Sequence, residues 1–284
     1  MSEDIKGILT GQSKEVFYDG MWLLNCWGNA SPIDVAFVLA SSKKAFLWNS
    51  QLHLPAIQVY HGAPHPLMHS ALQNGIAIVR LTTKELVWDQ YAYQFAHELC
   101  HVVTQHTHMG KRFGWTKNTE QSWLEESFCE AASFLTLKRL SKIWEVLPPW
   151  PHWISYAPQF QNYLTITIND YGAQPNNFLT WFTDNESSLR EDALQRNKNA
   201  VIALKLLPLM ECNPHSIGAL SHFSGIEKKP EQSLLSFSSR VVRIKYTIRT
   251  TIYFTSCPPV RPLSLANFHN NRLVVKSPYS AIHY

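Results

Sequence analysis

Two histidines four positions apart, His97 and His101, have the most specific chemical spacing in the chain, and Glu98 directly follows the first of them. On an α-helix, side chains at positions i and i+4 project from one face a turn apart, so both imidazoles can bind one metal ion. Zinc accepts imidazole nitrogen in tetrahedral sites. The carboxylate of Glu98 would lie beside the ion, where it acts as a general base on water and not as a ligand. This pattern predicts a Zn²⁺ site.

A catalytic zinc site also needs a third protein ligand and an open fourth position. The extended motif that ends in a third histidine requires Gly at position 104 and His at position 107, but the chain has Thr104 and Thr107. A carboxylate is the other option, and the run Trp123-Leu124-Glu125-Glu126-Ser127-Phe128 supplies two adjacent ones. The 24 residues between His101 and Glu126 are enough for a loop and an antiparallel return of the chain.

The HExxH motif followed by this run resembles the gluzincin metallopeptidases, which comprise the thermolysin-like and aminopeptidase-like zincins. In that family the two histidines lie on one helix, and a glutamate on the next helix completes the zinc site. The resemblance covers about residues 76–137 and implies that Glu126 is the third ligand. It also implies that Glu130, four residues further on, orients a metal-binding histidine.

The run departs from the aminopeptidase pattern at two positions. Glu125 stands in place of asparagine, and Ser127 stands in place of glycine. Glu125 is therefore a rival for the third ligand position, or else a solvated charge on the helix.

The resemblance implies a zinc-dependent hydrolase, a peptidase with peptide or protein substrates, in which Glu98 accepts the proton of the attacking water. The oxyanion would need a further hydrogen-bond donor, and no spacing selects among Tyr156, Tyr163, His152 and His215. One alternative is a non-catalytic zincin-like domain that binds a metal or a protein partner. Another is a helical structural protein with a fortuitous motif. The intact Glu98 favours the enzyme, because a pure binding site does not need that carboxylate.

Hydrophobic periodicity predicts a helix for each half of the site. The segment Trp88–His106 contains neither Pro nor Gly and carries apolar residues at helical spacing, and Gln121–Ile143 is a second helical segment. Strands are expected at Ala56–Tyr60 and Ile76–Leu81. In zincins an edge strand runs beside the active-site helix, and its backbone can pair with an extended peptide. The resemblance implies this role for Ile76–Leu81, and a plain core strand is the alternative. Two further helices are predicted over residues 157–168 and 186–211.

These elements indicate an α+β fold that is mostly α, with a small N-terminal sheet and a helical C-terminal half. We expect one zincin-like domain over residues 1–225, with the sheet and the HExxH helix in about 1–110 and a helical part in 111–225. Residues 226–284 are expected to be a basic tail of doubtful structure, which is either a small β appendage or a stretch that is not under folding selection, as after a reading-frame shift. Positions 227–284 hold nine basic and two acidic residues, whereas the rest of the chain holds 16 basic and 19 acidic ones. The net charge of +4 therefore describes the tail and does not indicate nucleic-acid binding.

Composition bounds the class of protein further. A chain of 284 residues with 45% hydrophobic residues can bury a core, which excludes a disordered chain. No apolar run reaches the roughly 18 residues of a membrane span, and the N-terminus lacks the apolar region of a signal peptide, so we expect no membrane association. Five cysteines without a CxxC pattern indicate reduced thiols and a cytoplasmic location. Cys100 and Cys129, which fall on the two predicted site helices, are interpreted as small buried apolar residues.

Overall fold

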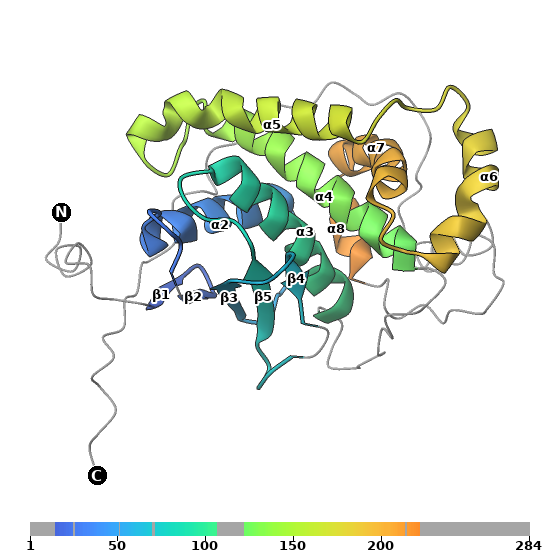
Figure 1. Ribbon diagram of the computed structural model, residues 1–284. Coiled ribbons are helices and arrows are strands. Elements are labelled where there is room, and N and C mark those ends of the chain that lie inside the picture. Colours follow the sequence, from blue (N-terminus) through green and yellow to red (C-terminus); the bar gives the residue numbers. More distant parts are fainter. Residues whose placement is uncertain are drawn as a thin grey trace, which may run out of the picture.

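The computed structural model describes residues 15–24, 26–50, 52–69, 72–106, 122–213 and 215–221 (Figure 1). Its elements in chain order are β1 (Glu15–Tyr18), β2 (Met21–Leu24), α2 (Pro32–Phe46), β3 (Ile57–His61), β4 (Leu67–Met68), β5 (Ala77–Leu81), α3 (Trp88–His106), α4 (Ser122–Ile143), η2 (Pro151–Tyr156), α5 (Ala157–Asp170), α6 (Phe178–Glu191), α7 (Arg196–Cys212) and α8 (His215–Leu220). The fold is α+β and mostly helical, as the sequence predicts. The basic tail predicted over residues 226–284 lies outside the described residues.

The five strands form one mixed sheet in the order β1-β2-β3-β5-β4. β2, β3 and β5 run parallel, whereas β1 and β4 are antiparallel to their neighbours. β1 and β2 form a hairpin around Asp19 and Gly20, which have φ angles of 52° and 78°. Such left-handed conformations suit a two-residue hairpin turn, and glycine adopts them without a steric penalty.

The strand before the HExxH helix is internal, so the core-strand alternative is correct and the edge-strand interpretation is wrong. β5 pairs with β3 on one side and with Leu67 and Met68 of β4 on the other. Within the described residues, β4 is therefore the edge strand on that side. Only two residues of β4 pair, and Pro64 and Pro66 precede them, so no alternating apolar pattern marks this strand in the sequence.

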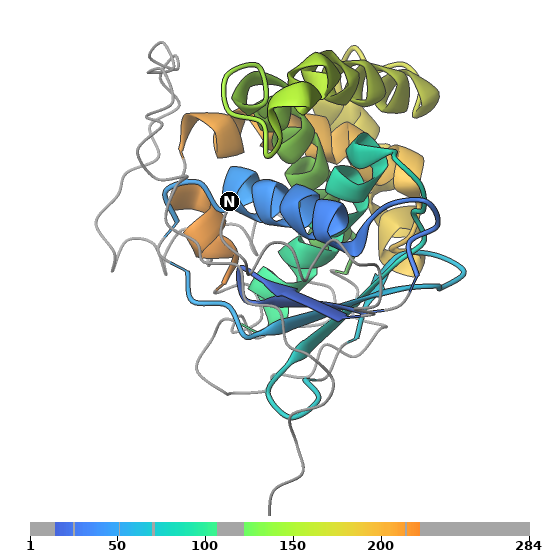
Figure 2. The ribbon, with the colours of Figure 1, turned by 90° about the vertical axis from the view of Figure 1, so that its left-hand side faces the viewer.

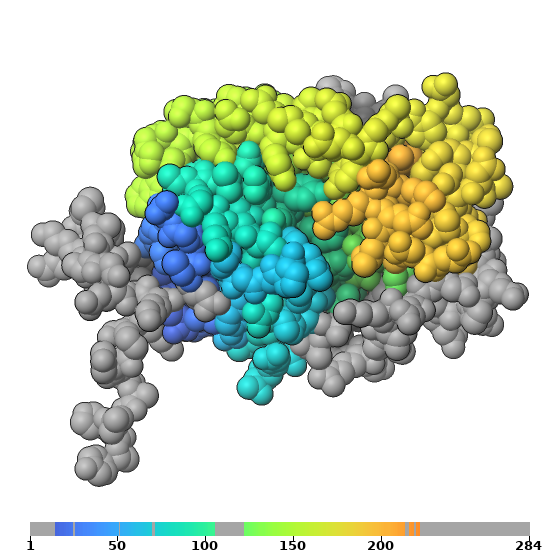
Figure 3. All heavy atoms as spheres, in the orientation of Figure 1, coloured from blue at the N-terminus to red at the C-terminus, as the bar shows by residue number. Residues whose placement is uncertain are grey.

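The helices gather on one face of the sheet (Figures 1 and 2). α2 and α3 pack on the strands, α4 packs on both of these helices, and α5 and α7 pack on α4. In the space-filling view, green residues of α4 lie recessed between the cyan part of the sheet and the orange α7 (Figure 3). Because α4 has neighbours on several sides, its buried residues extend around most of the helix.

α3 and α4 run antiparallel, and their register positions the candidate site. The Ser133 hydroxyl donates to the backbone oxygen of Tyr93 at 2.9 Å, and one turn further along α3, His97 lies beside Glu130. As the residue number rises along α3, the number of the contacting residue on α4 therefore falls. The middle of α3 therefore faces the first turns of α4, which carry the predicted glutamates.

The opposite end of α4 is fixed against α2. The Trp144 indole donates a hydrogen bond to Ser41 Oγ at 2.9 Å. The Arg139 guanidinium donates to the backbone oxygens of Ala45 and Phe46, at 2.7 and 3.2 Å. These oxygens belong to the last turn of α2, where carbonyl groups lack partners within the helix. Arg139 of α4 therefore donates hydrogen bonds to two carbonyl oxygens at the C-terminal end of α2.

The prediction of a single helix over residues 186–211 is wrong, because the structure has two helices there, α6 and α7. Asp192 interrupts them with an extended backbone, at φ −136° and ψ 106°. Its Oδ1 accepts a hydrogen bond from the backbone N–H of Leu194 at 2.9 Å. A short polar side chain that bonds to a neighbouring backbone group competes with the helix in this way.

None of the helices in the described part of the chain combines the length and the apolar character that crossing a bilayer requires. Cys26, Cys100 and Cys129 carry free thiols. Cys212 is disulfide-bonded, so the prediction of reduced cysteines is wrong for this residue.

Candidate metal centre

The structure brings the three predicted ligands together between α3 and α4. His97 and His101 project from the same face of α3, with ring centroids 5.2 Å apart. The Glu126 carboxylate of α4 faces both rings. Its Oε2 lies 3.2 Å from Nε2 of His97, and its Oε1 lies 3.6 Å from Nε2 of His101. Two imidazole nitrogens and one carboxylate therefore converge on the same small volume.

A second carboxylate lies behind each imidazole. Nδ1 of His97 is 3.7 Å from Oε2 of Glu130, and Nδ1 of His101 is 2.9 Å from Oε1 of Glu125. Histidines that bind metals usually donate their other ring N–H to a carboxylate, which fixes the tautomer and the ring orientation. Both rings thus have Nε2 directed toward Glu126 and Nδ1 directed toward a second carboxylate, an orientation in which both Nε2 atoms can bind one ion.

Glu125, the rival third ligand, lies behind the site. Besides His101, its Oε1 accepts hydrogen bonds from the Thr104 hydroxyl at 2.6 Å and from the Gln105 amide at 3.0 Å. Because Oε1 of Glu125 has three hydrogen-bond partners, we assign Glu125 the role of orienting the His101 ring. Of the two adjacent glutamates, Glu126 is the one whose oxygens approach both Nε2 atoms.

Glu130 has its own support in two tyrosines that the sequence reasoning missed. The Tyr93 hydroxyl donates to Oε1 of Glu130 at 2.5 Å, and the hydroxyls of Tyr93 and Tyr171 lie 2.9 Å apart. Tyr93 precedes His97 by four residues and therefore lies on the same face of α3. That spacing was the available signal for Tyr93. No comparable signal marks Tyr171, because it follows α5, far away in the sequence.

Without a metal ion, facing charges stabilise the ionised forms of the side chains. Burial lowers the pKa of His101, but Glu126 and Glu125 outweigh this and raise it to about 9. Burial also lowers the pKa of His97, and its bonds to Glu126 and Glu130 raise it well above the usual value. Burial would raise the pKa of Glu126, but the two imidazolium charges lower it to about 2. The ion-free centre is therefore a cluster of ion pairs.

Glu98, the predicted general base, is 3% exposed. Burial raises the pKa of its carboxyl group, and the charges of His97 and His101 counter part of that rise. A carboxylate whose pKa is raised toward neutrality is a better base near pH 7. The environment of Glu98 thus suits the predicted role.

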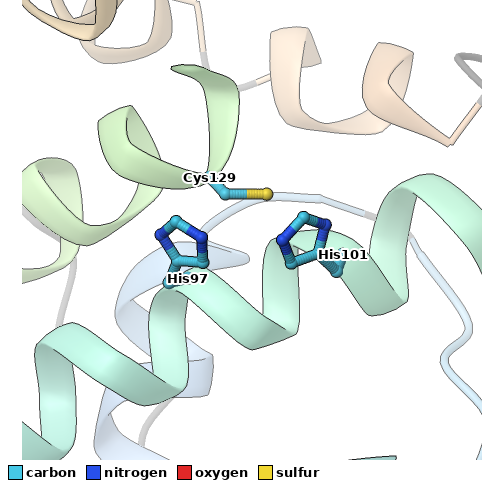
Figure 4. A group of neighbouring side chains, drawn as sticks. All are labelled: His97, His101 and Cys129. Atoms are coloured by element: carbon cyan, nitrogen blue, oxygen red, sulfur yellow. The ribbon is translucent and has the colours of Figure 1, made fainter. Parts of the chain in front are cut away.

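Cys129 is a further member of the cluster, which the sequence reasoning interpreted only as an apolar residue. It is fully buried on α4. Its sulfur and one nitrogen from each of His97 and His101 all lie within 4.8 Å of one another. Figure 4 shows the sulfur reaching from α4 toward the two rings on α3. The available signal was its position three residues after Glu126, on the same face of the helix.

The predicted donors for an oxyanion are dispersed. Tyr156 accepts a hydrogen bond from the backbone N–H of Asp89 at 3.4 Å and is thus held at the start of α3. His152 lies on η2, next to Trp153. Tyr163 packs edge-on against the ring of Tyr93, with centroids 5.8 Å apart, and so lies against the support of the site. The side chain of the fourth candidate, at position 215, lies outside the described residues.

The donor set fits zinc, which is bound by imidazole nitrogen and carboxylate oxygen, with three protein ligands in catalytic sites. No family model, curated protein or solved structure matches the chain. The functional interpretation therefore depends on the geometry of the centre.

Proposed function

We propose that this protein is a zinc-dependent hydrolase of the gluzincin type, with His97, His101 and Glu126 as ligands. The observation that carries the proposal is the position of the Glu126 carboxylate, 3.2 and 3.6 Å from the two Nε2 atoms. Each Nδ1 meanwhile faces a different carboxylate, so the rings are already oriented to bind an ion. An accidental pair of surface histidines would have no such arrangement.

The chemistry follows from the residues around the ion. Bound zinc lowers the pKa of water toward 7 and polarises a carbonyl group. Glu98, buried beside the two histidines, accepts the proton of the attacking water and passes it to the leaving amine. Glu125 and Glu130 keep the imidazoles in the orientation that ligation needs.

The sheet supports a peptide as the substrate. β4 is an edge strand that packs against α3, the helix that carries the two histidines. An extended peptide can pair with the backbone of such an edge, and main-chain hydrogen bonds then hold it in register. We infer that the substrate chain lies along β4.

The test of the hydrolase is the variant Glu98→Gln, assayed on a mixed peptide library beside the wild type. We expect it to bind zinc and to lose about 10²–10⁴-fold in hydrolysis, because the amide cannot accept the proton. Glu145→Gln, on an exposed glutamate beyond α4, is the matched control and should keep full activity. Full hydrolysis by Glu98→Gln would refute the base assignment, and untagged wild type that binds no zinc would refute the proposed function.

The ligand assignment is tested by the zinc content of two neighbouring variants. Glu126→Ala should lose stoichiometric zinc, since it removes a ligand. Glu125→Ala should retain zinc with about 10–100-fold weaker affinity, since it removes only the orienting partner of His101. The reverse order of the two effects would assign the third ligand to Glu125.

A further inference from the structure

We propose that the thiolate of Cys129 binds the same metal ion as a fourth protein ligand, so that the resting site is closed. This inference rests on the proposed function, and it goes beyond it in the ligand set. α3 contributes two donors one turn apart, His97 and His101. α4 contributes a second pair on its facing side, Glu126 and Cys129, three residues apart. The Glu126 oxygens lie 3.2 and 3.6 Å from the two Nε2 atoms, and the Cys129 sulfur lies within 4.8 Å of one nitrogen of each ring.

The distances favour ligation by sulfur. At zinc bond lengths of about 2.0–2.1 Å to nitrogen and about 2.3 Å to sulfur, tetrahedral ligands lie about 3.5 Å apart. The Cys129 sulfur and the two imidazole nitrogens already lie within 4.8 Å of one another. Small side-chain rotations would therefore bring all three to one ion.

In the ion-free centre, burial, the Cys100 thiol and the nearby glutamates raise the pKa of the Cys129 thiol well above its usual value, so the thiolate would form only as the metal binds. Cys129 is fully buried, and a divalent ion in such a place needs compensating anions. Glu126 and the thiolate together carry two negative charges, which neutralise the ion. Zinc binds thiolate sulfur well, and the thiol proton is released to solvent when the metal binds.

A sulfur at the fourth position controls the access of water. Catalytic zinc sites keep a position open, whereas sites with four protein ligands are closed. Water would reach the ion when the Cys129 side chain rotates away, or when the ion accepts a fifth ligand. The resting protein would then hydrolyse more slowly than a variant without the sulfur.

The experiment replaces zinc by Co²⁺ in the full-length, untagged protein and records its absorption spectrum. We expect visible ligand-field bands and a near-ultraviolet charge-transfer band, which a cobalt–thiolate bond produces. Cys129→Ser should keep the ligand-field bands and lose the charge-transfer band. Cys26→Ser, which changes an exposed free thiol, is the control and should keep both.

Each outcome separates this inference from the proposed function. Cobalt bound by the wild type without a charge-transfer band would overturn the Cys129 assignment and leave the hydrolase standing. No cobalt binding in the wild type would refute both. If circular dichroism shows that Cys129→Ser is unfolded, X-ray absorption on the zinc-loaded wild type decides. A sulfur neighbour at about 2.3 Å would support the assignment, and a shell of only nitrogen and oxygen would overturn it.

Discussion

Each imidazole of the centre lies between two carboxylates, one on each side of the ring. His97 has Glu126 at Nε2 and Glu130 at Nδ1, and His101 has Glu126 and Glu125 in the equivalent places. Such a ring cannot turn without breaking a charge-assisted contact. The donors are therefore held in position by their neighbours before any ion arrives.

The ion pairs predict how the stability of the metal-free protein depends on pH. The pKa of His101 is raised to about 9, so its contribution is complete below 6.5 and is lost as the pH rises through about 9. The pKa of Glu126 is lowered to about 2, so its contribution is complete above 4.5 and is lost as the pH falls through about 2.

We therefore expect the free energy of unfolding of the metal-free protein to be highest between about pH 4.5 and 6.5. Between pH 6.5 and 9 it should fall by up to about 3 kcal/mol, as measured by urea denaturation in the presence of a chelator. His101→Asn should show a smaller fall over the same range. A flat profile in the wild type would contradict the ion-pair description.

Tyr93 gives a second prediction at the scale of the residue. Tyr93→Phe removes the hydroxyl that donates to Glu130, so the carboxylate behind His97 loses a hydrogen bond. We expect zinc affinity to weaken by about 10–100-fold, measured by competition with a coloured chelator. Tyr163→Phe, on the tyrosine that packs edge-on against Tyr93, is the control and should bind zinc normally. Equal affinities for all three proteins would show that Tyr93 does not position the ligand.

At the scale of the element, long amphipathic segments were predictable and short or interrupted ones were not. The bounds of α3 agree with the prediction, because 19 residues without Pro or Gly leave a clear helical pattern. β4 has only two residues, so it leaves no pattern at all. The break between α6 and α7 depends on the hydrogen bond of Asp192 to its own segment, which hydrophobic periodicity does not report.

Arg139 gives a prediction for the packing of α4 on α2. Arg139→Ala leaves the backbone oxygens of Ala45 and Phe46 without their guanidinium partner in a partly buried place. We expect a loss of about 1–3 kcal/mol in the free energy of unfolding, measured by chemical denaturation. Lys142→Ala, which changes a side chain that is 66% exposed on the same helix, should change it by less than about 0.5 kcal/mol. If the two variants lost similar amounts of unfolding free energy, the hydrogen bonds of Arg139 to the end of α2 would not be important for stability.

At the scale of the whole molecule, the site depends on the packing of α3 against α4, which the sequence describes only indirectly. The motif and the run after it predicted that His97, His101 and Glu126 belong together, and the register of α3 against α4 provides the contact. Tyr171 could not be predicted, since it joins the centre only through the packing of α5 on α4. Cys129 is buried in the core, as predicted, but its position beside the two imidazoles was not predictable, because a buried thiol has the same sequence signal as an apolar side chain.

A metal ion shared by α3 and α4 should stabilise the whole fold. At a free zinc concentration of about 1,000 times the Kd, the free energy of unfolding should rise by about 4 kcal/mol, seen as a higher Tm in calorimetry. A chelator should reverse the shift. His97→Ala should abolish it, whereas His152→Ala, on the distant η2, should not. An equal shift in both variants would place the stabilising ion elsewhere.

The paired carboxylates behind the rings have a consequence for how the proposed ion would be acquired. Domains such as zinc fingers assemble only around the metal, so their loading is inseparable from their folding. Here the imidazoles are already oriented by Glu125 and Glu130. Under the proposed function, occupancy would follow the local supply of metal, rising and falling reversibly while the polypeptide keeps its shape.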